Sequence, residues 1–191
     1  MVATDGQPEV IGSYRIEGVL GAGGMGVVYR GVDAQGRVAA IKVIRASFTS
    51  AEALRRFERE AQIRIEHPNV VRVLETGSDA DGAPFIAFEL LEGETLAERL
   101  GRGPMEIDAI VDLGLAICAG LSAAHREGVV HRDLKPSNVF LEAGGGVKLL
   151  DFGVARLADG ATQLTEAGRV VGTLDYLSPE QAEGRPVIEA T

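Results

Sequence analysis

The sequence is poor in cysteine and in positive charge, and both shortages narrow the range of functions. Cys118 is the only cysteine in 191 residues, which excludes a disulfide framework and a metal site built on cysteine thiolates and fits a reducing cytosol. The chain has 19 lysine and arginine residues against 28 aspartate and glutamate residues, so its formal net charge is −9. This balance argues against nucleic acid or an anionic membrane as the main partner, and any phosphate ligand has to be held by local groups and metal.

Long hydrophobic segments are also lacking. The start of the chain, Met1–Gly12, is polar and acidic and has no apolar stretch of the kind found in signal peptides. The most apolar run, Leu113–Ala124, is shorter than a bilayer requires, and Asp108 and Asp112 precede it. We therefore expect a soluble, cytoplasmic chain without a membrane segment. Its 46% hydrophobic and 25% charged residues are ordinary for a folded protein and suffice for one domain or two small lobes.

A glycine-rich stretch, Gly21–Gly26, separates two strand-like runs, Tyr14–Leu20 and Val27–Val32. Glycines let backbone N–H groups approach phosphates without obstruction by a Cβ atom. With 25 glycines in the chain the spacing alone is weak evidence, and a flexible hairpin turn is the alternative. The element after the glycines is another strand, whereas a dinucleotide-binding or P-loop site would open a helix, so a glycine-rich hairpin over phosphates is favoured.

A lysine interrupts the next apolar run, Val38–Ile44. Lys42 would be costly inside such a strand unless its ammonium group meets an anion, although a lysine on an exposed edge strand is the alternative. The following stretch, Thr49–Ile65, has the apolar spacing of a helix, and Glu60 lies on the flank of its apolar face. Glu60 could therefore meet Lys42, or it could be a solvated helix charge paired with Arg64 four residues later.

The rest of the chain alternates short strands and helices. We expect strands over Val70–Glu75, Pro84–Leu90 and Val147–Leu150, a linker at Leu91–Glu94, a short helix over Thr95–Leu100 and a long helix over Glu106–Glu127 with Gly128 at its end. This order predicts an α+β protein in which the strand-rich part comes first.

Polar residues are densest in the loop His131–Asn138, which reads His-Arg-Asp-Leu-Lys-Pro-Ser-Asn and is followed thirteen residues later by Asp151. A lone aspartate would most often brace a turn. In this group, however, Asp133 can accept a proton and Lys135 can neutralise phosphate charge. Asn138 and Asp151 can offer oxygens to a hard cation, which completes the parts of a phosphoryl-transfer site.

At these residues the chain resembles eukaryotic-like (Hanks-type) serine/threonine protein kinases, which share the pattern His-Arg-Asp-x-Lys-x-x-Asn followed by Asp-Phe-Gly. The resemblance implies that Asp133 orients the acceptor hydroxyl and takes its proton, and that Lys135 offsets charge on the transferred phosphoryl group. It further implies that Asn138 and Asp151 hold Mg²⁺. Lysine at position 135 is typical of specificity for serine and threonine rather than tyrosine.

The resemblance also implies a nucleotide site. Lys42 would hold the α- and β-phosphates of ATP and pair with Glu60. The implied ATP-binding residues are Leu20, Gly21, Ala22, Gly23, Gly24, Met25, Gly26, Val27, Val28, Ala40, Lys42, Glu89 and Leu91. His131 is expected to be a packed structural histidine rather than a general base.

The stretch from Asp151 to Glu180 is similar to a kinase activation segment, and its Thr173–Ala182 part looks particularly like bacterial members of the family. Its polar middle carries Thr162 and Thr165, which are candidate autophosphorylation sites. Autophosphorylation there would involve a dimer of two kinase chains.

We therefore expect a protein-kinase-like two-lobe α+β fold. It consists of a polar tail over residues 1–13, a β-rich N-lobe over 14–91 with one regulatory helix, and a partial, mainly helical C-lobe over 92–191. Family members continue after the activation segment into further helices, so this sequence resembles a truncated member. The long helix Glu106–Glu127 should then leave an apolar face uncovered.

Three functional interpretations remain open at this stage. The first is an ATP- and Mg²⁺-dependent kinase that acts on serine and threonine hydroxyls of protein substrates, including its own. The second is a catalytically weak or inactive nucleotide-binding or docking module. The third is a fragment that does not fold alone. No nucleic-acid partner is expected.

Overall fold

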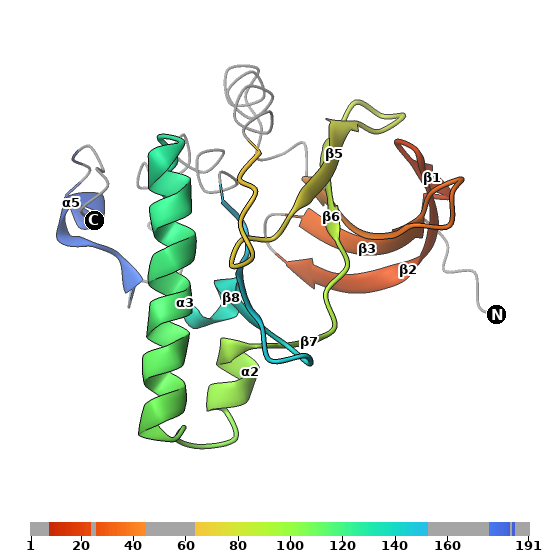
Figure 1. Cartoon of the computed structure of the whole chain (residues 1–191). Helices are drawn as coiled ribbons and strands as arrows, with labels where there is room; N and C mark the ends of the chain where they lie inside the picture. The colour runs from red at the N-terminus through yellow and green to blue at the C-terminus, as the bar shows by residue number, and fades with distance from the viewer. Residues whose placement is uncertain (1–7, 24–25, 45–63, 153–175, 184, 186–191) are drawn as a thin grey trace. The chain divides into compact units, whose positions relative to one another are not determined.

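The computed structural model describes residues 8–23, 26–44, 64–152, 176–183 and 185, and the chain divides into two compact units (Figure 1). The first unit comprises Met1–Thr49 and Val73–Leu91. The second comprises Ser50–Arg72 and Glu92–Thr191. The expected helix Thr49–Ile65, with Glu60, falls mostly outside the described residues; its last two, Arg64 and Ile65, are described and are not helical.

The first unit is a six-stranded antiparallel sheet that curves strongly in Figure 1, with the strand order β1-β2-β3-β4-β6-β5. Its strands are β1 (Val10–Ile11), β2 (Tyr14–Gly23), β3 (Gly26–Val32), β4 (Val38–Ile44), β5 (Val73–Ser78) and β6 (Pro84–Glu89). On β2, Tyr14 and Ile16 are buried while Arg15 and Glu17 are not, as expected for a strand with one face on a core. The predicted strands at Tyr14, Val27, Val38 and Pro84 are confirmed.

The core of this unit combines buried side chains from four of the strands, β1, β2, β4 and β6. Its buried members are Ile11, Tyr14, Ile16, Ala39, Ile41, Phe85 and Ala87. Burying such side chains stabilises the sheet by about 25 cal/mol per Å² of apolar surface removed from water. The sheet therefore has a core of its own.

The glycine-rich stretch is more regular than the sequence suggests. Strands β2 and β3 stay paired as far as Ala22 opposite Val27 and Gly23 opposite Gly26, so much of the expected glycine-rich hairpin belongs to the strands themselves. Glycine carries no side chain that would obstruct the neighbouring strand. At Gly26 a Cβ atom would collide with the backbone carbonyl of Val43 on β4.

The second unit contains a three-stranded antiparallel sheet in the order β7-β8-β9 and the helices that surround it. Its elements are β7 (Gly93–Thr95), α2 (Leu96–Leu100), α3 (Ile107–Arg126), the 3₁₀ turn η2 (Pro136–Asn138), β8 (Val139–Glu142), β9 (Val147–Leu149) and α5 (Pro179–Ala182). The short and long helices predicted here are confirmed. The predicted linker at Leu91–Glu94 instead enters β7, whose Gly93 pairs with Glu142.

Helix α2 begins where the sequence expects it because Thr95 forms a reciprocal capping box with Glu98. The Thr95 hydroxyl accepts from the Glu98 backbone N–H at 3.2 Å, and the Glu98 carboxylate accepts from the Thr95 backbone N–H at 2.7 Å. These bonds satisfy two backbone donors that a helix start leaves without partners.

Helix α3 packs one side on the sheet and leaves apolar side chains of its first half exposed. The core of the unit joins Leu113 to Leu96, Val139 and Leu149. Gly120 permits the close approach, because a Cβ atom there would lie 2.8 Å from the Asn69 carbonyl oxygen. The exposed apolar residues are Ile107, Ile110, Val111 and Leu115, so the predicted uncovered apolar face is present.

Helix α3 also satisfies a length and composition test for a membrane span within the described part of the chain. Its 20 residues include an 18-residue window of mean hydropathy 1.8. The apolar run Leu113–Ala124 is too short, but the residues that precede it lengthen the helix. A core helix of a soluble protein meets the same criteria, so this is weak evidence for a membrane segment.

The strand predicted over Val70–Glu75 exists, but it begins three residues later than expected, at Val73. Val71 donates its N–H to the Leu149 carbonyl at 3.0 Å, and Leu149 donates to the Asn69 carbonyl at 2.9 Å, so this part lies against β9 in the second unit. Strand β5 begins only at Val73 and pairs with β6 in the first unit. A run that is continuous in sequence is thus shared between two sheets.

Candidate active site

The loop that follows α3 begins at a helix end formed by glycine. Gly128 has φ 69°, and the N–H groups of Gly128 and Val129 donate to the carbonyls of His125 and Ala124 at 2.9 and 3.0 Å. A residue in the left-handed region ends a helix in this way, and glycine adopts it without a Cβ penalty. The chain then turns directly into His131–Asn138.

Asp133 lies at the centre of a polar cluster in this loop. The Lys135 ammonium is 3.0 and 2.8 Å from the two carboxylate oxygens of Asp133. Nδ2 of Asn138 donates to the Asp133 carbonyl at 2.7 Å and to its carboxylate at 3.0 Å. The cluster therefore presents a carboxylate that is held by a cation and an amide, and that is still 36% exposed to solvent.

The orientation of the Asn138 amide follows from its partners. A backbone carbonyl can only accept a hydrogen bond, so the atom facing it is Nδ2. Asn138 is only 6% exposed. Because its donor group is engaged by Asp133, the oxygen Oδ1 is the atom with which Asn138 can serve a cation.

His131 links the loop at Asp133 to the segment after β9 that contains Leu150 and Asp151. Its ring is 2% exposed and packs on Phe152 at a centroid distance of 4.5 Å. Nε2 lies 2.9 Å from the Leu150 carbonyl oxygen, which requires a proton on Nε2, while Nδ1 accepts from the Asp133 backbone N–H at 3.4 Å. Burial lowers the pKa of His131 below 6.5, and the Leu150 carbonyl and the Asp133 and Asp151 carboxylates oppose this only in part. His131 is therefore a neutral, packed residue.

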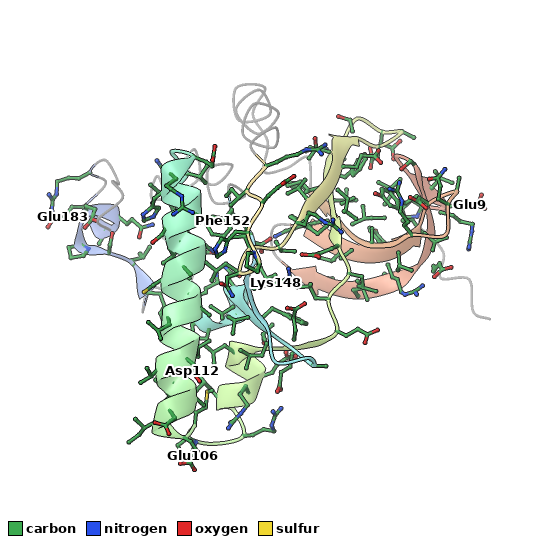
Figure 2. All side chains as sticks on the ribbon, viewed as in Figure 1. Glu9, Glu106, Asp112, Lys148, Phe152 and Glu183 are labelled. Atoms are coloured by element: carbon green, nitrogen blue, oxygen red, sulfur yellow. The ribbon has the colours of Figure 1, made fainter. Side chains whose placement is uncertain are left out.

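Asp151 lies two residues beyond the end of β9 in a constrained conformation. Its φ is 60°, in the left-handed region that aspartate adopts more readily than most side chains. The preceding residue, Leu150, donates its N–H to the Asn138 carbonyl at 2.9 Å. The two residues predicted to bind metal thus belong to hydrogen-bonded neighbouring segments. Phe152, labelled in Figure 2, packs against the apolar core of the unit.

The predicted nucleotide-binding residues that the structure describes belong mostly to the first unit. Lys42 is in the middle of β4, with Val28 on β3 and Ile86 on β6 as its register partners, so it is not on an edge strand. Glu89 ends β6 opposite Ala39. The remaining described members lie along β2, β3 and β4 or just after β6: Leu20, Gly21, Ala22, Gly23, Gly26, Val27, Ala40 and Leu91.

Several predicted residues lie outside the described part of the chain. They are Gly24, Met25, Glu60, Thr162 and Thr165. The proposed pairing of Lys42 with Glu60 and the two candidate phosphorylation sites therefore stay predictions.

Two residues near the site were missed by the sequence reasoning. Asn69 donates from its side chain to the Val147 carbonyl at 2.9 Å and so fixes a segment beside β9. Gln181 donates to the Arg132 carbonyl at 2.7 Å. The Ser-x-x-Gln spacing of Ser178 and Gln181 could have indicated a helix cap. No local sequence pattern predicts the bond from Gln181 to the Arg132 carbonyl, 49 residues away.

Comparison with known proteins places this geometry in a family. The chain matches the protein kinase domain over residues 14–190. It is 43% identical over 185 residues to the serine/threonine-protein kinase pkn2 of Myxococcus xanthus, covering 92% of this chain and 22% of that protein. It is 37% identical over 188 residues to the serine/threonine-protein kinase PknB of Mycobacterium leprae, covering 94% of this chain and 30% of that protein.

A solved structure shares the fold. The crystal structure of Rad53 residues 1–466 in complex with AMP-PNP matches with a TM-score of 0.70 and 26% identity, over 90% of this chain and 43% of that one. The chain spans about a third or less of the length of the curated relatives named above. The expected kinase-like α+β fold and the resemblance to bacterial serine/threonine kinases are confirmed. This chain belongs to the protein kinase family.

Proposed function

We propose that this chain transfers the γ-phosphoryl group of ATP to serine and threonine hydroxyls of proteins in a Mg²⁺-dependent reaction. The observation that carries the proposal is the cluster around Asp133, where Lys135 and Asn138 hold a carboxylate that solvent still reaches. Phosphoryl transfer demands little covalent chemistry from a protein, and positioned charges do most of the work.

In this proposal Asp133 is the proton acceptor. Its carboxylate orients the acceptor hydroxyl and takes the hydroxyl proton as the new oxygen–phosphorus bond forms and the bond from the γ-phosphorus to the departing ADP breaks. The amide of Asn138 and the ammonium of Lys135 hold the Asp133 carboxylate in place for this role. Lys135 offsets the charge on the transferred phosphoryl group, which supports serine and threonine rather than tyrosine as acceptors.

The residues present fit a magnesium ion. Mg²⁺ prefers oxygen ligands and keeps several waters and substrate phosphates, so a protein supplies only one or two groups. Asn138 and Asp151 provide such oxygens on neighbouring segments joined by the bond from Leu150 to Asn138. Among the described residues no group of three or more histidine, cysteine, aspartate or glutamate side chains forms a denser metal site. The ion would neutralise phosphate charge during transfer.

The nucleotide would be held by the first unit. We assign Lys42 to the α- and β-phosphates of ATP, with Glu60 as its ion-pair partner. The paired glycine-rich ends of β2 and β3 would offer their backbone N–H groups to the phosphates. The central position of Lys42 in the sheet supports this assignment, because a strand lysine away from the edge needs an anion nearby. Glu89 and Leu91 would offer backbone groups to adenine.

Thr162 and Thr165 are proposed as autophosphorylation sites, which would require two chains to meet as a dimer. A cytoplasmic location accompanies this proposal, since the single cysteine and the reducing conditions it fits are typical of that compartment.

The proposal is tested by incorporation of radiolabelled phosphate from ATP into the chain and into a serine- and threonine-containing protein substrate. Asp133→Asn should abolish incorporation, because the amide cannot take the hydroxyl proton. Asp112→Asn, a change on the exposed side of α3 (Figure 2), is the matched control and should keep it. Equal incorporation by wild type and Asp133→Asn would contradict the assignment of Asp133.

A second candidate is a nucleotide-binding or docking module without turnover. The exposed apolar residues of α3, such as Ile107 and Leu115, favour it because they form a surface suited to contact with other protein. A rise in melting temperature with Mg·ATP, without any phosphate incorporation, would support this module over the enzyme.

A further inference from the structure

We propose that Gln181 is a positioning residue for Asp133, acting through the peptide bond between Arg132 and Asp133. The side chain of Gln181 joins helix α5 to the loop that carries the cluster around Asp133. This inference rests on the proposed function only in taking Asp133 as the proton acceptor.

The Gln181 side chain makes two hydrogen bonds, and their partners fix the orientation of its amide. Its Nε2 donates to the Arg132 carbonyl at 2.7 Å, and its Oε1 accepts from the Ser178 backbone N–H at 3.1 Å. Its own backbone N–H donates to the Ser178 hydroxyl at 3.4 Å. A carbonyl can only accept and a backbone N–H can only donate, so the amide cannot be turned round.

The capping role alone does not require glutamine. Glutamate serves a capping box as well as glutamine does, since only an acceptor oxygen is needed to receive the N–H of the capping residue. The amide nitrogen is what glutamine adds. Here the amide nitrogen donates to the Arg132 carbonyl, a bond that glutamate could not make, so this bond explains glutamine at position 181.

The peptide unit between Arg132 and Asp133, whose carbonyl accepts from Gln181, follows a residue with an unusual backbone conformation. Arg132 has φ 63°, a conformation that costs energy for a residue with a side chain and persists only where neighbouring contacts enforce it. A peptide unit is planar, so fixing its carbonyl also fixes its N–H. That N–H, on Asp133, donates to Nδ1 of His131 at the longer distance of 3.4 Å.

Gln181 and His131 therefore hold opposite edges of one peptide plane, and the Gln181 bond is the shorter of the two. The plane sets the direction in which the Asp133 side chain leaves the backbone, before Lys135 and Asn138 act on the carboxylate. A small displacement of a reacting group is enough to lower a rate by about a hundredfold. The loss of this bond should thus reduce turnover without removing any group that touches substrate.

Two variants separate the positioning role from the helix cap. Gln181→Glu keeps an acceptor for the Ser178 N–H but replaces the donor with an oxygen that repels the Arg132 carbonyl. Ser178→Ala removes the capping hydroxyl but keeps the Gln181 donor and the Ser178 backbone N–H. We expect kcat of Gln181→Glu to fall about tenfold, as the loss of one well-placed bond implies, with KM for ATP within about twofold of wild type. Ser178→Ala should keep kcat within about twofold and lower the melting temperature instead.

The opposite pattern would overturn the inference. If both variants lose kcat in proportion to their loss of melting temperature, Gln181 serves the helix alone. If Gln181→Glu turns over as wild type does, its bond to Arg132 has no part in the reaction.

A second measurement keeps the inference separate from the proposed function. Amide hydrogen exchange at Asp133 can be followed in the full chain whether or not it transfers phosphate. Faster exchange at Asp133 in Gln181→Glu than in Ser178→Ala would support the positioning role, even if wild type shows no incorporation. Equal exchange in the two variants would reject it, even in an active kinase.

Discussion

The side-chain amide nitrogen of Asn138 lies 2.7 Å from the backbone carbonyl oxygen of Asp133 and 3.0 Å from its carboxylate. One buried amide thus binds both the backbone and the carboxylate of the same residue. The 3₁₀ turn that contains Asn138 makes this possible, because it returns the chain toward Asp133 within five residues. The relationship makes Asn138 a brace for Asp133 as well as a proposed ligand of Mg²⁺.

The dual role of Asn138 predicts the effect of Asn138→Asp. The variant keeps an oxygen for the metal but removes the donor and places a second carboxylate beside Asp133, where like charges repel. We expect phosphate incorporation to fall about a hundredfold or more and the melting temperature to drop, as leaving a buried group without its partner costs about 1–3 kcal/mol. Ser137→Asp adds the same charge at the exposed neighbouring position and serves as the control. Comparable losses in the two variants would mean that charge in the loop, and not the bond to Asp133, sets activity.

The neutral state of His131 predicts how stability depends on pH. Its pKa in the folded chain is lower than the unfolded value of about 6.5, so the unfolded chain binds more protons between these two values. The contribution of His131 is therefore fully present above pH 6.5 and is lost as pH falls through the folded pKa, with a slope of at most about 1.4 kcal/mol per pH unit. The check is the melting temperature of wild type and His131→Gln between pH 8 and pH 5.

We expect the wild type to lose more stability than His131→Gln over this acidic range, since glutamine does not titrate. His67 and His125 are the same in both chains and cancel in the comparison. Parallel curves for the two proteins would show that His131 does not carry this dependence.

Two glycines of helix α3 predict opposite responses to alanine. At Gly120 a Cβ atom would lie 2.8 Å from the Asn69 carbonyl and 2.9 Å from a Leu149 methyl group, so Gly120→Ala should destabilise the chain by about 1–3 kcal/mol. At Gly114 an added Cβ atom would have no neighbour within 4 Å apart from the helix's own backbone. Gly114→Ala should therefore stabilise the helix by about 0.5–1 kcal/mol. Chemical denaturation of both variants measures the difference. Similar stabilisation by both would mean that α3 does not pack on Asn69 and β9 through Gly120.

Elements with a strong local pattern were predictable from sequence. The alternation along β2, the lysine-bearing strand β4 and the long apolar spacing of α3 each gave the correct type of element, because one face of each packs on a core. The predicted short helix Thr95–Leu100 is present as α2, and the bond between Thr95 and Glu98 that fixes its start forms within a single turn. The polar loop at Asp133 was recognisable because five residues at fixed spacing carry its chemistry.

Elements whose partners are distant in sequence were not predictable. Val70 and Val71 read as the beginning of β5, yet they pair with Leu149, while Val73 joins a different sheet. The strand-like run before the glycines was expected to end at Leu20, yet the pairing of β2 with β3 continues through Gly21 and Gly23. Hydrophobic periodicity records which face of a segment is buried, but it does not record which neighbour buries it.

The sequence by itself supplied the candidate groups for phosphoryl transfer, Asp133, Lys135, Asn138 and Asp151, and their spacing indicated the kinase family to which the chain belongs. The tertiary structure alone decided how Asp133 is held. Asn138 reaches it through a 3₁₀ turn. His131 accepts from the Asp133 backbone N–H with Nδ1 while its Nε2 donates to Leu150, and Gln181 donates to the preceding carbonyl, that of Arg132, across 49 residues. The physical reason is that hydrogen-bond partners are chosen by distance and direction in space, and residues far apart in the chain meet only after it has folded.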